Sequence, residues 1–349
     1  YPFRIDFTKV NSRQYELELE ILDVPLLKTS DEHKRLANDL LYFTDMILKW
    51  LQDSPVLIDE SEKVDVLQHY AQLLNLSCER FVGAQPRSLH MSDFETKLIK
   101  TPYAATLKAD GTRQIMLLLP FRPVYLIDRN LNVRRTPYIY SPDATCEGSV
   151  LDAEMLKDEA LTLQVFDIIC FKGRDLRNMK PVVTLANRLQ NIRNIIPHIQ
   201  HATFNETAPS VSLKPYYFLD NIDGVTELLE RQWELQKSTH DGFIFVPCEE
   251  SYSTSSSWQN LLKWKPCDHL TIDFKVRPIP NKNGGVLQVM DTGKTFQDFE
   301  PDSRTPLFFI DMDAHSDYSI FKDDLIAECG YDMATKNFVV HRWRLDKTM

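Results

Sequence analysis

The sequence lacks the features that define several classes of protein. Its six cysteines, at positions 78, 146, 170, 248, 267 and 329, include no CxxC pair and no cluster with the spacing of a zinc site. This pattern predicts reduced core thiols in an intracellular protein. No apolar run approaches the roughly 18 residues that a membrane-spanning helix needs, and the first residues have no charged-then-apolar signal layout. We therefore expect no membrane partner.

Positively charged residues are also fewer than negatively charged ones. The 349 residues include 40 Lys and Arg against 50 Asp and Glu, a formal net charge of −10. This balance argues against a protein that coats nucleic acid non-specifically, because phosphate binding requires a cationic face, but a local basic site remains compatible with it. The apolar content of 43% and charged content of 26% are typical of a globular protein with two or three domains.

The amino-terminal stretch has the alternation of β-strands. In RIDFTKV and YELELEIL, a period of two puts Glu16, Glu18 and Glu20 on one face and the leucines between them on the other. From residue 31 the apolar spacing changes to three and four, which predicts helices at about 31–53 and 61–76. Residues 83–89, GAQPRSL, have the composition of a linker.

The rest of the sequence predicts an α+β fold. Short apolar runs between 100 and 170 indicate twisted antiparallel sheets, and helical patterns follow at 181–197 and 223–237. Strand patterns return at 241–247 and 269–276, and several short strands after 285 predict a small final β-barrel.

Residues 108–113, KADGTR, pose the first chemical question, because they place a lysine beside a glycine between two predicted strands. Taken alone, such a string is more often a solvated charged turn. Lys108 is also an amine that could attack a phosphate approaching the glycine backbone. A nucleophilic lysine requires burial or neighbouring cations, which Lys263 and Lys265 in LLKWKP could supply.

Other segments offer matching groups. Asp152 and Glu154 alternate on one strand and could bind a ribose or a metal-bound water, while Phe166 could stack on a base. Asp241 begins the strand that carries Ile244. Singly, each of these residues is more often an ordinary core or surface residue. Their order along the chain favours a shared site.

In this order, the motifs resemble those of mRNA capping guanylyltransferases, which are covalent nucleotidyltransferases. The resemblance begins at about Gln85. KADGTR matches the family's KxDGxR motif, LDAEM matches its DGE-type motif and LQVFDII matches its aromatic strand. DGFIF matches the DGxIF motif, LLKWKP the lysine motif and HRWRLDK the closing RxRxDK motif. Ala153 stands where the family usually has glycine. The resemblance implies a nucleotidyltransferase domain of twisted antiparallel sheets with flanking helices at 85–268 and an OB-fold β-barrel at 269–349.

The resemblance also implies a reaction and a site. Lys108 would attack GTP to form lysyl-GMP, and GMP would pass to the diphosphate 5′ end of RNA, with Mg²⁺ or Mn²⁺ as cofactor. The implied roles are as follows: Glu154 and Asp241 on the metal or ribose, Arg113 on the sugar-phosphate, Phe166 and Ile244 on the guanine faces, Lys214 reading guanine, Lys263 and Lys265 on the α-phosphate, and Arg342, Arg344 and Lys347 on the leaving pyrophosphate.

The first 30 residues resemble the last strands of tunnel-type RNA triphosphatases, joined by a helical connector at 31–84. Because the sequence begins with Tyr1, we expect a fragment of a larger viral- or plasmid-type capping protein, with an upstream triphosphatase domain and a downstream methyltransferase as partners. The expected location is then cytoplasmic, or nuclear for a cellular protein. Two alternatives stay open: an ATP-dependent polynucleotide ligase, and an inactive scaffold module of a capping complex.

Overall fold

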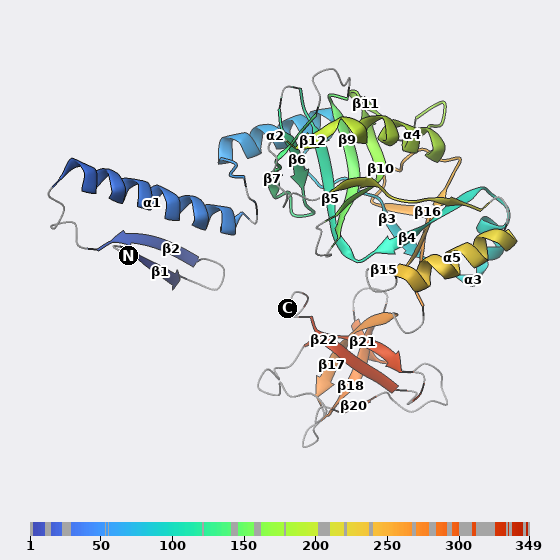
Figure 1. Ribbon diagram of the computed structural model, residues 1–349. Coiled ribbons are helices and arrows are strands. Elements are labelled where there is room, and N and C mark those ends of the chain that lie inside the picture. Colours follow the sequence, from blue (N-terminus) through green and yellow to red (C-terminus); the bar gives the residue numbers. More distant parts are fainter. Residues whose placement is uncertain are drawn as a thin grey trace.

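A computed structural model describes most of the chain (Figure 1). The described residues are 3–10, 15–22, 29–52, 54, 56–120, 122–140, 146–156, 162–177, 179–201, 210–219, 222–236, 240–266, 270–278, 284–291, 295–299, 309–311, 325–332, 334, 337–344 and 347. Within them, no helix combines the length and the apolarity required to cross a membrane.

The amino-terminal unit is a hairpin beside a long helix. Strands β1 (Phe3–Lys9) and β2 (Tyr15–Ile21) pair antiparallel, and helix α1 (Ser30–Leu51) follows. Thr29 and Glu32 form a reciprocal capping box that satisfies the first backbone N–H groups of α1. The ring centroids of Phe3 and Phe43 are 5.4 Å apart, so the hairpin contacts α1, yet α1 has no buried residue. Figure 1 shows this unit apart from the sheets that follow.

The predicted connector divides at this point. Helix α2 (Glu60–Leu73) packs Val66 and Tyr70 into the main hydrophobic core, unlike α1. The predicted linker at 83–89 is wrong, because Gln85–Ser88 form β3 and pair parallel with a later strand. The linker-like composition misled the prediction, since a short edge strand tolerates proline. A short helical segment follows, with α3 (Met91–Asp93) and η2 (Phe94–Leu98).

Two sheets form the main body. The first runs in the order β11-β10-β9-β5-β6-β7, with β13 also pairing β10, and the second runs β14-β4-β15-β16-β3. The strands of the first sheet are β5 (Gly111–Leu118), β6 (Val124–Ile127), β7 (Val133–Arg135), β9 (Ser149–Leu156), β10 (Leu163–Phe171), β11 (Arg174–Asp175) and β13 (Val211–Leu213). Those of the second, besides β3, are β4 (Tyr103–Ala109), β14 (Tyr217–Phe218), β15 (His240–Pro247) and β16 (Ser257–Trp264). The pairing is antiparallel as predicted, except for β3 with β16 and β13 with β10.

Helices cover these sheets. Helix α4 (Leu185–Ile195), followed by η3 (Ile196–His198), packs on β10 and buries Leu189 and Ile192, while α5 (Ile222–Gln236) lies beside β15. A small sheet pairs β8 (Tyr138–Tyr140) with β12 (Ile199–His201). Both predicted helices are therefore confirmed, with α4 beginning four residues later than 181 because Thr184 caps it.

The carboxyl-terminal unit is a further antiparallel sheet in the order β19-β18-β17-β21-β22, with β20 also pairing β18. Its strands are β17 (Thr271–Pro278), β18 (Gly284–Asp291), β19 (Thr295–Asp298), β20 (Phe309–Asp311), β21 (Ile326–Asp332) and β22 (Asn337–Trp343). Phe274, Leu287 and Cys329 lie in its small separate core. One of the short strands predicted after 285, PLFFIDM at 306–312, falls largely outside the described residues, which include only 309–311 of it.

Candidate active site

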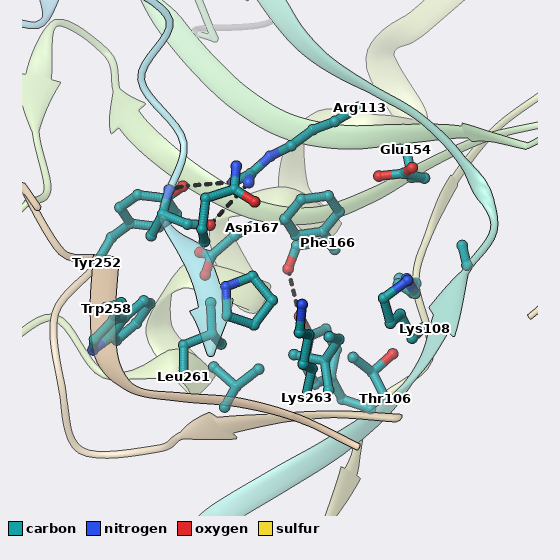
Figure 2. A pocket seen from close by; sticks show the side chains of 18 of the residues that line it. Thr106, Lys108, Arg113, Glu154, Phe166, Asp167, Tyr252, Trp258, Leu261 and Lys263 are labelled. Atoms are coloured by element: carbon teal, nitrogen blue, oxygen red, sulfur yellow. Dashed lines mark hydrogen bonds between the residues drawn. The ribbon is translucent and has the colours of Figure 1, made fainter. Parts of the chain in front are cut away.

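A cavity of about 320 Å³ is lined by side chains of both large sheets (Figure 2). Lys108, Glu154 and Thr106 lie on one side of it, Tyr252 and Trp258 on the other, and the ring of Phe166 between them. Seven of the predicted site residues line this cavity: Lys108, Arg113, Glu154, Phe166, Lys214, Ile244 and Lys263.

The KADGTR segment is the point where the chain passes from one sheet to the other. Lys108 lies in β4 of the second sheet, Asp110 alone separates the strands, and β5 begins at Gly111 in the first sheet. The segment is therefore not a hairpin turn. A Cβ atom at Gly111 would lie 2.3 Å from the backbone oxygen of Met155, so only glycine permits this approach to β9.

Asp241 holds two of the predicted lysines. It lies in a bulge of β15, where the register with β4 shifts between His240 and Phe243. Its carboxylate accepts a hydrogen bond from Lys108 Nζ at 2.6 Å and forms a second ion pair with Lys265 Nζ, also at 2.6 Å. Gly242, at φ +149°, lies so close to Trp264 that an added Cβ would be 2.0 Å from the Trp264 backbone oxygen, so glycine is required in this bulge.

These contacts determine the charge states nearby. Burial raises the pKa of Asp241, but hydrogen bonds from Lys108 and Lys265 outweigh it, so that the pKa is lower than usual. Burial and the two neighbouring lysine charges lower the pKa of Lys263. The site thus concentrates cations in a protein whose net charge is −10.

Arg113 is fixed by a buried network. Its Nε and Nη2 donate to the two carboxylate oxygens of Asp152 at 2.8 and 2.5 Å, and its Nη1 donates to the Ala84 oxygen at 2.8 Å. The Tyr252 hydroxyl donates to Asp152 at 2.6 Å and contacts Arg113 Nη2 at 3.1 Å. Most of the guanidinium donors therefore bind protein groups, which holds Arg113 rigidly at the cavity wall.

Phe166 forms the aromatic wall that the sequence predicts. The guanidinium carbon of Arg113 lies 5.4 Å from its ring centroid and Lys214 Nζ lies 5.7 Å from it, both within cation–π range. Ile244 lines the cavity from the other sheet, on β15. A flat ligand such as a purine base could lie against these two apolar walls.

Buried Lys214 and partly buried Glu154 line the same cavity and carry opposite charges that influence each other. Burial lowers the pKa of Lys214 to about 8, although the charge of Glu154 opposes that shift. Burial likewise raises the pKa of Glu154, against the charges of Lys214 and Arg113. Each charge therefore stabilises the other in a site where a lone charge would be costly.

Sequence reasoning missed several residues that line the cavity. Thr106 could have been found, because it lies two residues before Lys108 on the same strand. Asp167 pairs with fully buried Arg188 of α4 at 2.7 Å, a contact between residues 21 positions apart that no local pattern indicates. The other unpredicted lining residues include Arg129, Tyr216, Tyr252 and Trp258.

Glu154 and Asp241 are the carboxylates predicted to hold a metal. In the described part of the chain, no group of three or more His, Cys, Asp or Glu side chains is arranged to hold an ion. This donor set does not fit a resident protein cage, but it fits Mg²⁺, which often binds through one or two carboxylates together with substrate phosphates.

The structure does not bring the carboxyl-terminal cations into the cavity. Arg342 lies in β22, Arg344 and Lys347 follow that strand, and none of the three lines the cavity. Within the described residues, their carboxylate partners include Asp273 and Glu328 of the same unit.

Comparisons with known proteins place this site in a family. The family described as "mRNA capping enzyme, catalytic domain" matches residues 54–267, more than half of the chain and including α2. The chain is 26% identical over 245 residues to the mRNA-capping enzyme subunit alpha of Kluyveromyces lactis, covering 61% of this chain and 51% of that protein. The Saccharomyces cerevisiae subunit alpha is 29% identical, with 56% and 48% covered. A probable mRNA-capping enzyme of Acanthamoeba polyphaga mimivirus is 24% identical, with 78% and 28% covered.

The chain spans about half the length of the yeast relatives. Among solved structures, the ATP-dependent DNA ligase of bacteriophage T7 in complex with ATP aligns with a TM-score of 0.39 and 13% identity, covering 74% of this chain and 98% of that one. Mycobacterial DNA ligase D, complexed with ATP, aligns with a TM-score of 0.41 and 13% identity, covering 77% and 95%. The family match over residues 54–267 is decisive, and the chain belongs to the mRNA capping enzyme family.

Proposed function

We propose that this chain is an mRNA guanylyltransferase in which Lys108 is the nucleophile. The observation that supports it most is the cluster of Lys108, Asp241 and Lys265 beside a cavity that also holds Lys263. In the first half-reaction, Lys108 Nζ gives up a proton to solvent water and bonds to the α-phosphorus of GTP. The bond from that phosphorus to the bridging oxygen breaks, and pyrophosphate leaves with its electron pair.

The second half-reaction reverses the covalent bond. An oxygen of the terminal phosphate of a diphosphate-ended RNA attacks the same phosphorus, the N–P bond breaks, and the Lys108 amine regains a proton. Asp241 orients the amine in both steps through its 2.6 Å contact. Mg²⁺ or Mn²⁺, held by Glu154 and Asp241 with the substrate phosphates, would neutralise phosphoryl charge.

The cavity walls suit the nucleotide in this scheme. Phe166 and Ile244 face the guanine, Lys214 donates to it, and Lys263 and Lys265 bind the α-phosphate. We assign Arg113 a supporting role at the sugar-phosphate, because Asp152, Ala84 and Tyr252 occupy most of its donors.

The domain assignment is also a proposal. We assign the nucleotidyltransferase domain to 85–268 together with α2, and an OB-fold to 269–349, whose cations Arg342, Arg344 and Lys347 would meet the leaving pyrophosphate. The first 30 residues would end a triphosphatase domain of a longer, viral- or plasmid-type protein, with a methyltransferase downstream. A viral or plasmid origin would place the protein in the cytoplasm, and a cellular origin would place it in the nucleus.

The test is covalent labelling. With Mg²⁺ and α-phosphate-labelled nucleotides, the protein should acquire an acid-labile, alkali-stable label from GTP and not from ATP. Lys108→Ala and Lys108→Arg should both abolish the label, since arginine keeps its charge and does not deprotonate. Labelling from ATP would indicate a ligase, and absence of any label would indicate a scaffold module. Label that survives in both variants would remove Lys108 from the mechanism.

A further inference from the structure

A row of charged side chains crosses the carboxyl-terminal sheet. Asp273 of β17 is the cross-strand neighbour of Glu328 of β21, and Glu328 is the neighbour of Arg342 of β22. Like charges directly opposite one another destabilise a sheet unless a cation neutralises them. The two carboxylates therefore need cations at this place in the sheet.

Three cations meet that need. Arg344 Nη1 lies 3.4 Å from a carboxylate oxygen of Asp273 and 3.4 Å from one of Glu328, so it bridges the pair. Arg342 Nε donates to Glu328 at 2.7 Å, and Lys347 Nζ donates to Asp273 at 2.5 Å. The hydroxyl of Thr271 donates to the other oxygen of Glu328 at 2.9 Å. Each acid thus holds two cations, and hydrogen bonds fix both oxygens of Glu328.

The carboxylates use only part of what the cations can donate. A lysine ammonium has three N–H donors and a guanidinium has five, whereas Lys347 gives Asp273 one hydrogen bond and Arg342 gives Glu328 one. Donors therefore remain for an anion while the acids stay bound.

We propose that Asp273 and Glu328 are positioning residues that hold Arg342, Arg344 and Lys347 as one preorganised site for the leaving pyrophosphate. This inference rests on the proposed function, which assigns these cations to pyrophosphate. Long cationic side chains lose rotamer entropy when they converge on one anion. The acids impose that loss before the anion arrives, and the cost of separating the like-charged pair from its cations keeps the cluster on the sheet.

The experiment measures three rates in Glu328→Gln and Asp273→Asn: lysyl-GMP formation from GTP, release of GMP from the intermediate by added pyrophosphate, and GMP transfer to diphosphate-ended RNA. Asp298→Asn is the matched control, because Asp298 pairs with Arg277 at 2.6 Å in the same unit, away from the cluster. Arg344→Ala is the reference for loss of a cation, and thermal unfolding is followed for every variant.

We expect Glu328→Gln and Asp273→Asn to slow lysyl-GMP formation by about tenfold or more, since misplaced binding groups cost at least that much. Half-saturation by pyrophosphate should shift to higher concentration, while GMP transfer and the control variant should stay at wild-type rates.

Unchanged or faster lysyl-GMP formation in both variants would overturn the inference and show that the acids compete with pyrophosphate. The inference would also be overturned if GMP transfer slowed as much as lysyl-GMP formation, or if Asp298→Asn slowed lysyl-GMP formation equally, because either result would indicate a general loss of structure. If Arg344→Ala forms lysyl-GMP at the wild-type rate, the proposed pyrophosphate role of the cations fails first. If Arg344→Ala slows lysyl-GMP formation but Glu328→Gln and Asp273→Asn do not, the proposed pyrophosphate role of the cations stands, and only the positioning role of the two acids fails.

Discussion

The side chains of the cavity show how a protein with a net charge of −10 gathers several cations in one place. Asp241 pairs with two lysines, and Asp152 pairs with Arg113, so that much of the positive charge is internally compensated. Such pairs keep charged groups stable in a partly buried site. Among the described residues, Lys263 has no carboxylate within ion-pair distance although it lines the cavity, which supports its assignment to the α-phosphate.

The low pKa of Lys214 leads to a prediction at this scale. Burial lowers this pKa to about 8, so the amine is protonated below that pH and loses its charge as the pH rises through it. Because a charged amine donates a stronger hydrogen bond to the proposed guanine contact than a neutral amine does, GTP affinity should fall between about pH 7.5 and 9 as Lys214 loses its charge. Equilibrium binding of GTP across pH 6.5–9.5 measures this.

Lys214→Met is the control for that titration, because methionine has similar length and no ionisable group. The variant should bind GTP more weakly, with an affinity that changes little over the same pH range. An identical pH dependence in the variant and the unaltered protein would show that another group is responsible.

At the scale of elements, the single residue between β4 and β5 sets the geometry of the site. The crossing between sheets places Lys108 opposite β15 while β5 delivers Arg113 to the first sheet. Gly111 makes that crossing close, since an added Cβ would lie 2.3 Å from the Met155 oxygen and 2.8 Å from Glu154 Cγ. The backbone oxygen cannot move without disturbing the pairing of β5 with β9.

Gly111→Ala should therefore reduce lysyl-GMP formation by about a hundredfold, because a displacement of about 1 Å at a reacting group has an effect of that size. Gly173→Ala is the comparison: its φ is +75° and no atom lies within 4 Å of the added Cβ. That change should cost about 1–2 kcal/mol of stability and leave the labelling rate unaltered. Similar labelling rates in the two variants would contradict the close-approach argument.

Some parts of the site could be predicted from the sequence and others could not. Phe166 and Ile244 were predicted from the short motifs LQVFDII and DGFIF, and both line the cavity. The Arg113 network was not predictable, because Tyr252 lies 139 residues away in a serine-rich stretch. The strand at Gln85–Ser88 was mistaken for a linker, because its pairing partner β16 lies far along the chain. Short local motifs therefore identified the apolar walls, whereas pairing between distant segments determines which polar groups support them.

At the scale of the whole molecule, the chemistry is unevenly distributed. The cavity belongs to the two central sheets, while the cations proposed for pyrophosphate lie on the carboxyl-terminal sheet. The amino-terminal hairpin and α1 add no residue to either place, and Figure 1 shows them apart from the central sheets. The family match, which begins at residue 54, leaves out the same segment. Guanylyl transfer should therefore not depend on that segment.

The exposed stripe of Glu16, Glu18 and Glu20 gives the last prediction. These side chains lie on one face of β2, and Arg4 of β1 pairs with Glu20 at 2.7 Å. A metal inside a β-tunnel needs carboxylates from several sides, whereas the described hairpin has two strands and the described residues include no three-ligand group. Replacing all three glutamates by alanine should leave lysyl-GMP formation within about twofold, as for most exposed substitutions.

The unaltered protein should release no γ-phosphate from triphosphate-ended RNA with Mg²⁺ or Mn²⁺, because a single acidic face cannot surround the metal and the phosphate. A phosphate-release assay on the unaltered protein and the triple variant tests this, with lysyl-GMP labelling of the same samples as the control for folding. Metal-dependent release that disappears in the variant, while labelling persists, would show that the stripe belongs to a working triphosphatase site. Since the two described strands supply these carboxylates from one face only, such a site would have to draw its remaining ligands from outside this hairpin.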